Sequence, residues 1–200
     1  MSYSFWEAVK GRRSRYGFSS EKPVSEERIT QIVRDAIYYT PSAFNSQSTR
    51  IVILFHDNNR KLWDFTLEEL KKYTTEEQFE DTKTKVNQGL ASGYGTILFF
   101  EDQDVVKGLM DNFPLYKDNF PVWSQHTSAM HQFVVWTALE AEGLGASLQH
   151  YNPLIDSAVA KEWEIPDNWK LVAQMPFGKP LADPGEKTFS EVDARIKVFK

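Results

Sequence analysis

Residues 124–142 read Ser-Gln-His-Thr-Ser-Ala-Met-His-Gln-Phe-Val-Val-Trp-Thr-Ala-Leu-Glu-Ala-Glu, the most apolar helical pattern in the chain. Its apolar residues, among them Met130, Phe133 and Trp136, wrap most of the way round a helix of 3.6 residues per turn. A helix that is apolar on most sides is normally covered by neighbouring elements. We therefore expect residues 124–142 to form a long central helix.

Four apolar runs before and after this helix are predicted strands. They are residues 50–55, 96–100, a short run through Leu148, and 169–177. Nearly continuous apolar runs are typical of strands that are covered on both faces. Because helical patterns separate most of them, they indicate a mixed α/β layer structure, and the uneven helices argue against a regular doubly wound sheet. No linker or repeat interrupts the chain, so one domain is expected over residues 1–200.

Other helices are predicted where apolar or charged residues recur at helical spacing. Ser4 and Ser25 are the expected N-caps of the first two helices. Pro41 ends the second helix, because a residue before proline avoids the helical region. Asn152-Pro153 is expected to begin a late helix, with Asn as the cap and Pro at the first helical position. Two charged helices are expected at residues 59–72 and 76–90.

The composition is that of an ordinary globular protein, with 41% hydrophobic and 26% charged residues. The chain has no Cys, which excludes disulfides, thiolate nucleophiles and Cys-ligated metals. A net charge of −5 argues against general nucleic-acid binding. No apolar run resembles a secretion signal or a membrane span, so we expect a soluble, cytoplasmic protein with neither nucleic-acid nor membrane partners.

Two polar stretches indicate a ligand pocket. Residues 12–18 read Arg-Arg-Ser-Arg-Tyr-Gly-Phe, and guanidinium groups donate paired hydrogen bonds that match a phosphate. Residues 41–47 read Pro-Ser-Ala-Phe-Asn-Ser-Gln, and the amides of Asn45 and Gln47 suit a heterocycle with carbonyls and ring nitrogens. Together they predict a pocket for a phosphate-bearing planar cofactor. The alternative is a solvated basic helix end followed by an ordinary loop.

Other patterns in the sequence are weaker indications of a ligand-binding or catalytic site. Residues 143–146, Gly-Leu-Gly-Ala, resemble a glycine loop, but we expect them to end the central helix and pack on the next strand. His126 and His131 are five residues apart and face different sides of a helix, so they do not form a metal pair. His150 follows a strand, where either a ligand contact or a structural role is open. We expect no catalytic side chain and no metal site; a hydrolase with a hidden triad is a weaker option, since no Gly-x-Ser-x-Gly elbow is present.

In order and spacing, these segments resemble the nitroreductase family of FMN-dependent oxidoreductases. The shared elements are Arg12-Arg13-Ser14, the stretch 41–47, the turn 143–146 and Pro176-Phe177-Gly178-Lys179-Pro180. The runs 95–102, 119–124 and 148–153 are similar to the branch that contains the copper-induced nitroreductase and the fatty-acid-repression-mutant proteins of yeasts. The resemblance covers nearly the whole chain.

The resemblance implies an α+β fold, with a mixed sheet flanked by helices and a long central helix. It also implies a homodimer with two FMN molecules at the subunit interface, each in contact with both chains. The implied FMN-binding residues are Arg12, Arg13 and Ser14 at the phosphate and pyrimidine side, Ser42, Ala43, Asn45 and Gln47 reaching over from the partner subunit, Gln149, His150 and Tyr151 near the ring atom N5, and Lys187 and Arg195 in the tail. Tyr16 stands where many members carry Lys or Arg beside the pyrimidine, so Arg13 or Arg15 is expected to supply that charge. The 14% aromatic content, much of it outside the predicted core, also favours a broad homodimer interface.

The resemblance further implies an enzyme in which NADH or NADPH gives hydride to flavin N5 and a nitroaromatic or quinone acceptor is then reduced at the same place, in a ping-pong sequence. The aromatic segment 113–123 is a candidate for shaping that pocket. A flavin-binding storage or redox-sensing dimer with little turnover is the alternative. A role in stress response is raised by the family likeness alone.

Overall fold

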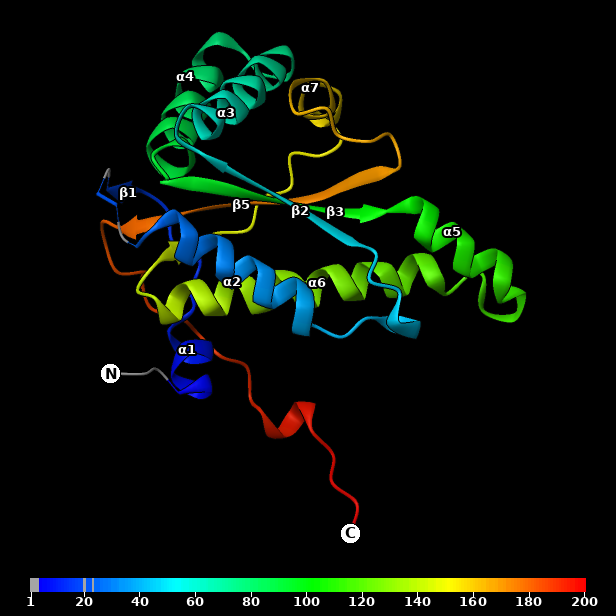
Figure 1. The fold of residues 1–200 in the computed structure, drawn as a ribbon. Helices are drawn as coiled ribbons and strands as arrows, with labels where there is room; N and C mark the ends of the chain where they lie inside the picture. Colours follow the sequence, from blue (N-terminus) through cyan, green and yellow to red (C-terminus); the bar gives the residue numbers. More distant parts are fainter. Residues whose placement is uncertain (1–3, 20, 23) are drawn as a thin grey trace.

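The chain folds as a sheet between two helical layers (Figure 1). A computed structural model describes residues 4–19, 21–22 and 24–200. The strands are β1 (Phe18–Ser19), β2 (Thr49–Phe55), β3 (Gly95–Asp102), β4 (Gly145–Ala146) and β5 (Trp169–Pro180). One face is covered by α3 (His56–Leu70), α4 (Glu76–Val86) and α7 (Asp156–Glu162), the other by α2 (Glu26–Tyr39) and α6 (Phe120–Ala141). The helices α1 (Phe5–Gly11) and α5 (Gln103–Asn112) lie at opposite ends of α6, and the expected α+β architecture is confirmed.

The strand order is β1-β5-β3-β2, with β4 pairing with β5. All pairs between these strands are antiparallel, and a separate parallel bridge joins Ser14 to Ala146. The register places Ile97 of β3 opposite Ile53 of β2 and Met175 of β5. The three long strands lie where the apolar runs predicted them. The two-residue strand β1 was not predicted, because so short a segment has no periodicity of its own.

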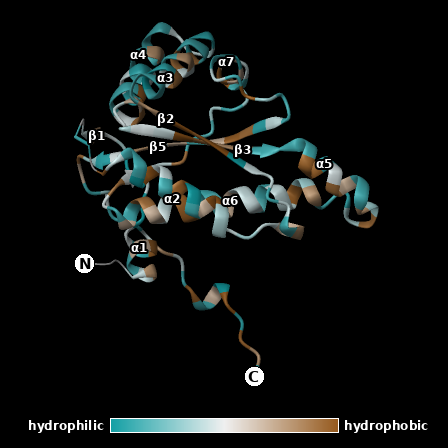
Figure 2. Ribbon diagram, in the orientation of Figure 1, coloured by the Kyte–Doolittle hydropathy of each residue, from teal (hydrophilic) through white to brown (hydrophobic). Residues whose placement is uncertain are grey.

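Two hydrophobic clusters form the core, one on each face of the sheet. Along β3, Ile97 and Phe99 face the cluster under α2 and α6, while Leu98 and Phe100 face the cluster under α3. This alternation follows from the two-residue period of a strand, and it explains why β3 is apolar at successive positions from Ile97 to Phe100. Figure 2 shows hydrophobic residues along the strands and largely hydrophilic residues on α3 and α4.

The long helix α6 is central, but it differs from the prediction in two ways. It begins at Phe120 rather than at Ser124, because Pro121 falls in the first turn, where proline needs no hydrogen-bonded N–H. One stripe of α6 is apolar and still about two-fifths exposed, at Met130 (38%), Phe133 (40%) and Val134 (39%). Within a single chain, therefore, α6 packs against the sheet and neighbouring helices but keeps one apolar stripe partly exposed.

Three predicted ends of the first two helices are confirmed, and the expected start of the late helix is wrong. Ser4 and Ser25 cap α1 and α2, and α2 ends before Pro41. The late helix α7 begins at Asp156, whereas Asn152-Pro153 forms a turn with a cis peptide bond. The Asn152 side chain does not cap a helix because its Oδ1 accepts a hydrogen bond from Gln174 Nε2 over 3.3 Å.

Candidate functional site

The cationic turn, residues 12–16, follows α1 and lies against β4. Ser14 bridges to Ala146, and the Arg15 N–H donates to the Ala146 carbonyl over 3.0 Å. Gly145 permits this approach, because a Cβ at that position would lie 2.7 Å from Arg15 Cδ. The turn therefore lies beside the start of the segment that leads to residues 149–151.

Arg12 is a fixed cation with unused donors. Its Cζ lies 4.5 Å from the centre of the Trp136 ring on α6. Its Nε is buried and has no hydrogen-bond partner among the residues that the structure describes. A buried guanidinium N–H without a partner is unfavourable unless a ligand accepts its hydrogen bond. Arg12 thus fits an anion such as the phosphate of FMN.

The other two arginines of the turn hold the C-terminal segment. Arg13 Nη2 donates to the Gly185 carbonyl over 2.8 Å, and Arg15 Nη1 lies 3.1 Å from Asp183 Oδ1. Arg15 Nη2 also lies 3.8 Å from Glu140 Oε1 on α6. Burial raises the pKa of Glu140, and the charges of Arg15 and Arg12 oppose that rise. Two carboxylates already match the charge of Arg15, which leaves Arg13 as the better replacement for the cation expected near Tyr16.

The cationic turn lies beside the segment that begins with β4, since Ser14 bridges to Ala146. Burial raises the pKa of Tyr151, and Tyr16 adds to the rise. Tyr16 itself is 54% exposed, and the Tyr151 ring meets Trp63 edge-on at 5.9 Å. Two of the predicted groups of flavin-binding residues are therefore neighbours in one chain.

Residues 149–151, which we call the flavin-facing loop because the sequence predicts that they line a flavin, are held by Gln174 of β5. Gln174 exchanges main-chain hydrogen bonds of 2.7 and 2.9 Å with Gln149, and its side-chain oxygen accepts the Tyr151 N–H over 2.8 Å. Gln174 is fully buried. This residue was not predicted from the sequence, although a single amide within the apolar run 171–177 was a signal that could have found it.

Residues 42–47, the third predicted group, form a loop of unusual backbone geometry. Phe44, Asn45 and Gln47 have φ angles of 55°, 50° and 48°, in the left-handed region that residues other than glycine rarely adopt. Ser42 stabilises the loop, since its Oγ accepts the Gln47 N–H and its carbonyl accepts the Asn45 N–H, each over 3.0 Å. Ala43 begins a short 3₁₀ turn that ends at Asn45. Backbone strain of this kind is concentrated at ligand sites.

Phe44 anchors this loop to the beginning of α6, far from the cationic turn. Its ring lies 5.2 Å from Phe120 and 5.9 Å from Trp123, whereas Arg12 lies on Trp136. At 1.5 Å per residue, the helix from Trp123 to Trp136 is about 20 Å long. Within one chain, the loop 42–47 and the cationic turn therefore lie toward opposite ends of α6 (Figure 1).

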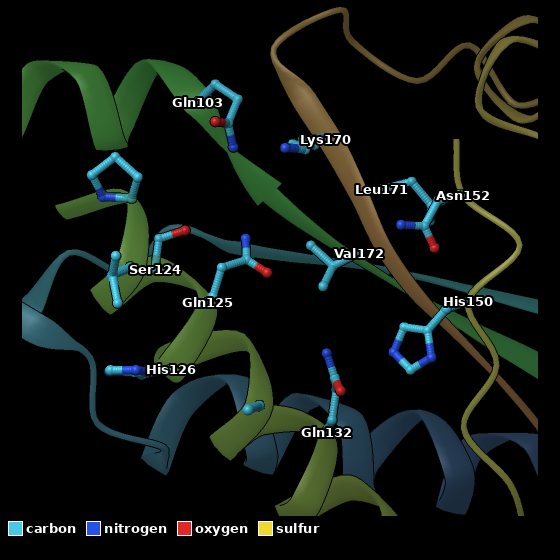
Figure 3. Close-up of a pocket in the computed structure, with 13 residues that line it drawn as sticks. Gln103, Ser124, Gln125, His126, Gln132, His150, Asn152, Lys170, Leu171 and Val172 are labelled. Atoms are coloured by element: carbon cyan, nitrogen blue, oxygen red, sulfur yellow. The ribbon is translucent and has the colours of Figure 1, made fainter. Parts of the chain in front are cut away.

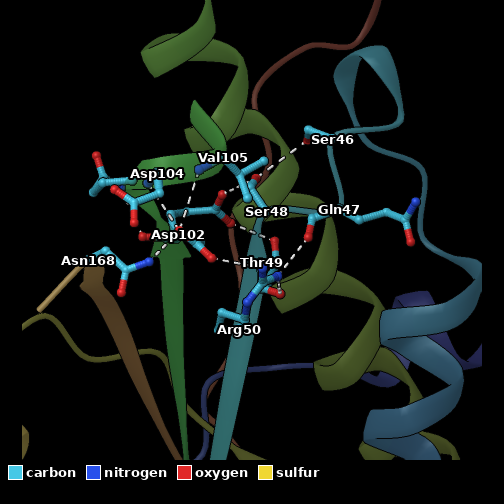
Figure 4. A network of polar contacts seen from close by, with 11 residues as sticks. Ser46, Gln47, Ser48, Thr49, Arg50, Asp102, Asp104, Val105 and Asn168 are labelled. Atoms are coloured by element: carbon cyan, nitrogen blue, oxygen red, sulfur yellow. Dashed lines mark hydrogen bonds and ion pairs between the residues drawn. The ribbon is translucent and has the colours of Figure 1, made fainter. Parts of the chain in front are cut away.

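A buried polar network fixes the strand that follows this loop (Figure 4). The hydroxyls of Ser48 and Thr49 each donate to Glu101 over 2.5 Å. Burial raises the pKa of Glu101, and these two hydrogen bonds oppose the rise. Arg50 pairs with Asp102 at 2.8 Å and also donates to the Gln47 carbonyl over 2.7 Å. The network connects the end of the loop to β3.

The tail carries the last two predicted residues, and the structure does not bring them to the cationic turn. The Lys187 Nζ lies 5.1 Å from the Phe189 ring, and Arg195 ends the short 3₁₀ helix η5 (Asp193–Arg195). After Gly185, which contacts Arg13, the tail runs away from the sheet (Figure 1). Phosphate binding by Lys187 and Arg195 stays a prediction.

An open cavity of about 710 Å³ lies between α6 and β5, next to the flavin-facing loop (Figure 3). Its walls include His150 and Asn152 after β4, Gln132 and His126 on α6, and Lys170 on β5. None of the lining residues is acidic. Most of its lining side chains are polar, among them His150, Gln132 and Lys170, so a cavity of this size can bind and orient a small polar molecule.

Across residues 4–19, 21–22 and 24–200, no cluster of three or more His, Asp or Glu is placed to hold a metal ion. In the same described part of the chain, no helix has the length and apolar character needed to cross a membrane.

Several known proteins of one family are similar to this chain in sequence or in fold. The nitroreductase family model matches residues 9–179. The nitroreductase FRM2 of Saccharomyces cerevisiae is 34% identical over 188 residues, which are 93% of each chain. The nitroreductase CinD from Lactococcus lactis, solved in complex with nicotinic acid, is 47% identical with a TM-score of 0.91 and covers 98% of this chain and 100% of its own. A nitroreductase-fold protein from Exiguobacterium sibiricum, solved with FMN, is 15% identical with a TM-score of 0.71, covers 99% and 98% of the two chains, and shows a common fold.

Proposed function

The chain belongs to the nitroreductase family, and on that basis we propose that it is an FMN-dependent oxidoreductase that passes electrons from NADH or NADPH to nitroaromatic or quinone acceptors. Membership also confirms the resemblance drawn from the motifs of the sequence. The ligands of the relatives support the proposal: CinD has been solved with nicotinic acid, chloramphenicol and 4-nitrophenol, and the protein from Exiguobacterium sibiricum with FMN.

The observation that supports the proposal most strongly is the environment of the Arg12 guanidinium. Its guanidinium is held on Trp136 at 4.5 Å, and its buried Nε has no partner in the described part of the chain. A phosphate accepts such donors in charge-assisted hydrogen bonds, which are stronger than neutral ones. FMN, when bound, supplies the ring that accepts hydride and passes electrons on.

We infer that two copies of the chain build each site. Arg12 and Gln47 lie toward opposite ends of α6, so one chain cannot bring them to the same ligand. A two-fold axis at the middle of α6 would place the loop 42–47 of one copy near the cationic turn of the other. The exposed stripe of Met130, Phe133 and Val134 provides the apolar surface for that contact.

In this arrangement the chain binds and orients the cofactor and the substrates, without a side-chain acid or nucleophile. Arg12, Arg13 and Ser14 bind the phosphate and pyrimidine side, with Lys187 and Arg195 of the tail as further phosphate ligands. The flavin-facing loop orients the ring near N5, beside Tyr16. The aromatic rings around Phe44 exclude water from one wall, and the cavity beside His150 receives the acceptor.

Spectroscopy and turnover of the purified protein test the proposal. A yellow protein with one FMN per chain that oxidises NADH or NADPH in the presence of a quinone or 4-nitrophenol would support it. Bound FMN with negligible turnover would instead support the storage or sensing dimer. A colourless protein that takes up no FMN would contradict both.

A further inference from the structure

We propose that Gln174 is the positioning residue of the flavin-facing loop, and that it leaves the His150 N–H as the one main-chain donor of this loop that can reach a bound ring. The inference rests on the proposed function, in which residues 149–151 line the flavin. It concerns how the loop is prepared for the ring before any ligand binds.

The hydrogen bonds of the three N–H groups support this assignment. The Gln149 N–H donates to the Gln174 carbonyl over 2.7 Å, and the Tyr151 N–H donates to Gln174 Oε1 over 2.8 Å. The His150 N–H between them has no partner within the described part of the chain, and His150 is exposed. The Gln149 and Tyr151 N–H groups are already used by Gln174, whereas the exposed His150 N–H is open to solvent, so it is the donor that a ligand can use.

Burial explains why an amide, rather than an apolar side chain, occupies this position. Gln174 is 0% exposed and lies between Ala173 and Met175, which are also 0% exposed. An amide in such a place is unfavourable unless its hydrogen bonds are made. Among the residues that the structure describes, the Gln174 amide makes them only with the segment after β4, to the Tyr151 N–H and to Asn152 Oδ1 at 3.3 Å. A methionine would fill a similar volume without this cost, so packing alone does not require glutamine.

The side chains of the loop point to opposite faces of the sheet. His150 and Asn152 line the cavity between α6 and β5 (Figure 3), whereas Tyr151 meets Trp63, a residue of the opposite core cluster. Gln174 thus holds the loop where its side chains alternate between the two faces of the sheet. A rotation of the Tyr151 peptide would offer a second donor to the ring and change the preference of the site for oxidised or reduced flavin.

The test combines residue-resolved hydrogen exchange of the protein as purified with FMN affinities in the oxidised and reduced states. Gln174→Met removes both side-chain hydrogen bonds at similar volume, and Gln174→Asn withdraws the amide by one methylene if the first variant does not fold. Gln174→Glu retains an acceptor oxygen for Tyr151. Thr66→Val is the matched control, because the one hydrogen bond of the buried Thr66 hydroxyl within the described residues goes to the Leu62 carbonyl on its own helix, over 3.0 Å.

We expect the Tyr151 amide to exchange at least tenfold faster in Gln174→Met or Gln174→Asn, more slowly in Gln174→Glu than in those two variants because an acceptor oxygen is retained, and at the wild-type rate in Thr66→Val. We also expect the ratio of the two FMN affinities to change at least tenfold in Gln174→Met, which is about 30 mV for a two-electron couple. Unchanged exchange and an unchanged ratio would overturn the inference. If the wild-type protein bound no FMN, the proposed function would fail, while the exchange rates would still decide whether Gln174 holds the loop.

Discussion

The guanidinium carbon of Arg12 lies 4.5 Å from the centre of the Trp136 ring, and the Arg12 Nε is buried without a hydrogen-bond partner in the described residues. An aromatic face attracts a cation without using its N–H groups. Trp136 therefore holds Arg12 in place and leaves its donors for a ligand. Arg15, three residues later, already donates to Asp183 and to the Ala182 carbonyl.

Removing Arg12 should weaken FMN binding. Each charge-assisted hydrogen bond to phosphate contributes roughly 1.5–3 kcal/mol, so Arg12→Ala should raise the dissociation constant by about one to two orders of magnitude. Arg12→Lys, which keeps the charge but not the paired donors, should fall between. Titration followed by flavin fluorescence measures both. Full, tightly held flavin in Arg12→Ala would show that the phosphate lies elsewhere.

Gly145 should be required for the position of the cationic turn. A Cβ at Gly145 would lie 2.7 Å from Arg15 Cδ and 3.2 Å from Pro180 Cβ, so Gly145→Ala should destabilise the fold by about 1–3 kcal/mol. Gly108 in α5 is the control: a Cβ there meets nothing within 4 Å, and Gly108→Ala should stabilise by about 0.5–1 kcal/mol. Urea unfolding of the two variants measures the contrast, and equal effects would be inconsistent with a close contact at Gly145.

His131 should make stability depend on pH. Burial lowers the pKa of His131, and its hydrogen bond to the Thr127 carbonyl opposes this only in part. The unfolded chain then binds a proton more readily than the folded one below about pH 6.5, so this contribution to stability is present above that pH and lost as pH falls through the folded-state pKa. His131→Asn should flatten the dependence, and exposed His126→Asn should not. Unfolding free energies measured from pH 8 to 5 test this, and parallel curves for wild type and His131→Asn would contradict it.

The apolar stripe on α6 should join two copies of the chain. Phe133 is 40% exposed, and a lysine there would place a charge in the proposed interface, so Phe133→Lys should shift the protein toward monomer and reduce its FMN content. Tyr73→Lys is the control, because Tyr73 is 69% exposed in the other helical layer, after α3. Sedimentation measures the oligomeric state. If the wild-type protein were a monomer, or if Phe133→Lys still formed a stable dimer, the apolar stripe on α6 would not be the dimer interface.

The parts of the fold that were predicted correctly depend on local sequence. The long strands follow from runs that are apolar at successive positions, and the caps Ser4 and Ser25 act within one helical turn. The predicted beginning of α6 at Ser124 is wrong because the helix extends four residues further, to Phe120, and proline at position 121 is tolerated in a first turn. At Asn152-Pro153, a contact from Gln174, far along the chain, replaces the expected helix start.

In the candidate site, too, some features follow from local sequence and others from tertiary contacts. The cationic turn and the loop 42–47 could be found from residue type alone. The different roles of Arg12 and Arg15 could not, because Trp136, Glu140 and Asp183 assign them through tertiary contacts. The role of Gln174 depends on the pairing of β5 with the segment after β4, which no periodicity reveals.

Mixed dimers test most directly whether two copies share each FMN site. Chains carrying Arg12→Ala and chains carrying Gln47→Ala should each bind FMN weakly as homodimers. In the mixed dimer one site combines both defects, while the other receives wild-type Arg12 from one chain and wild-type Gln47 from its partner. Calorimetric titration of the purified mixed dimer should find one FMN per dimer at wild-type affinity. Two equally weak sites would mean that each chain binds FMN with its own Arg12 and Gln47, and would contradict a site shared between two copies.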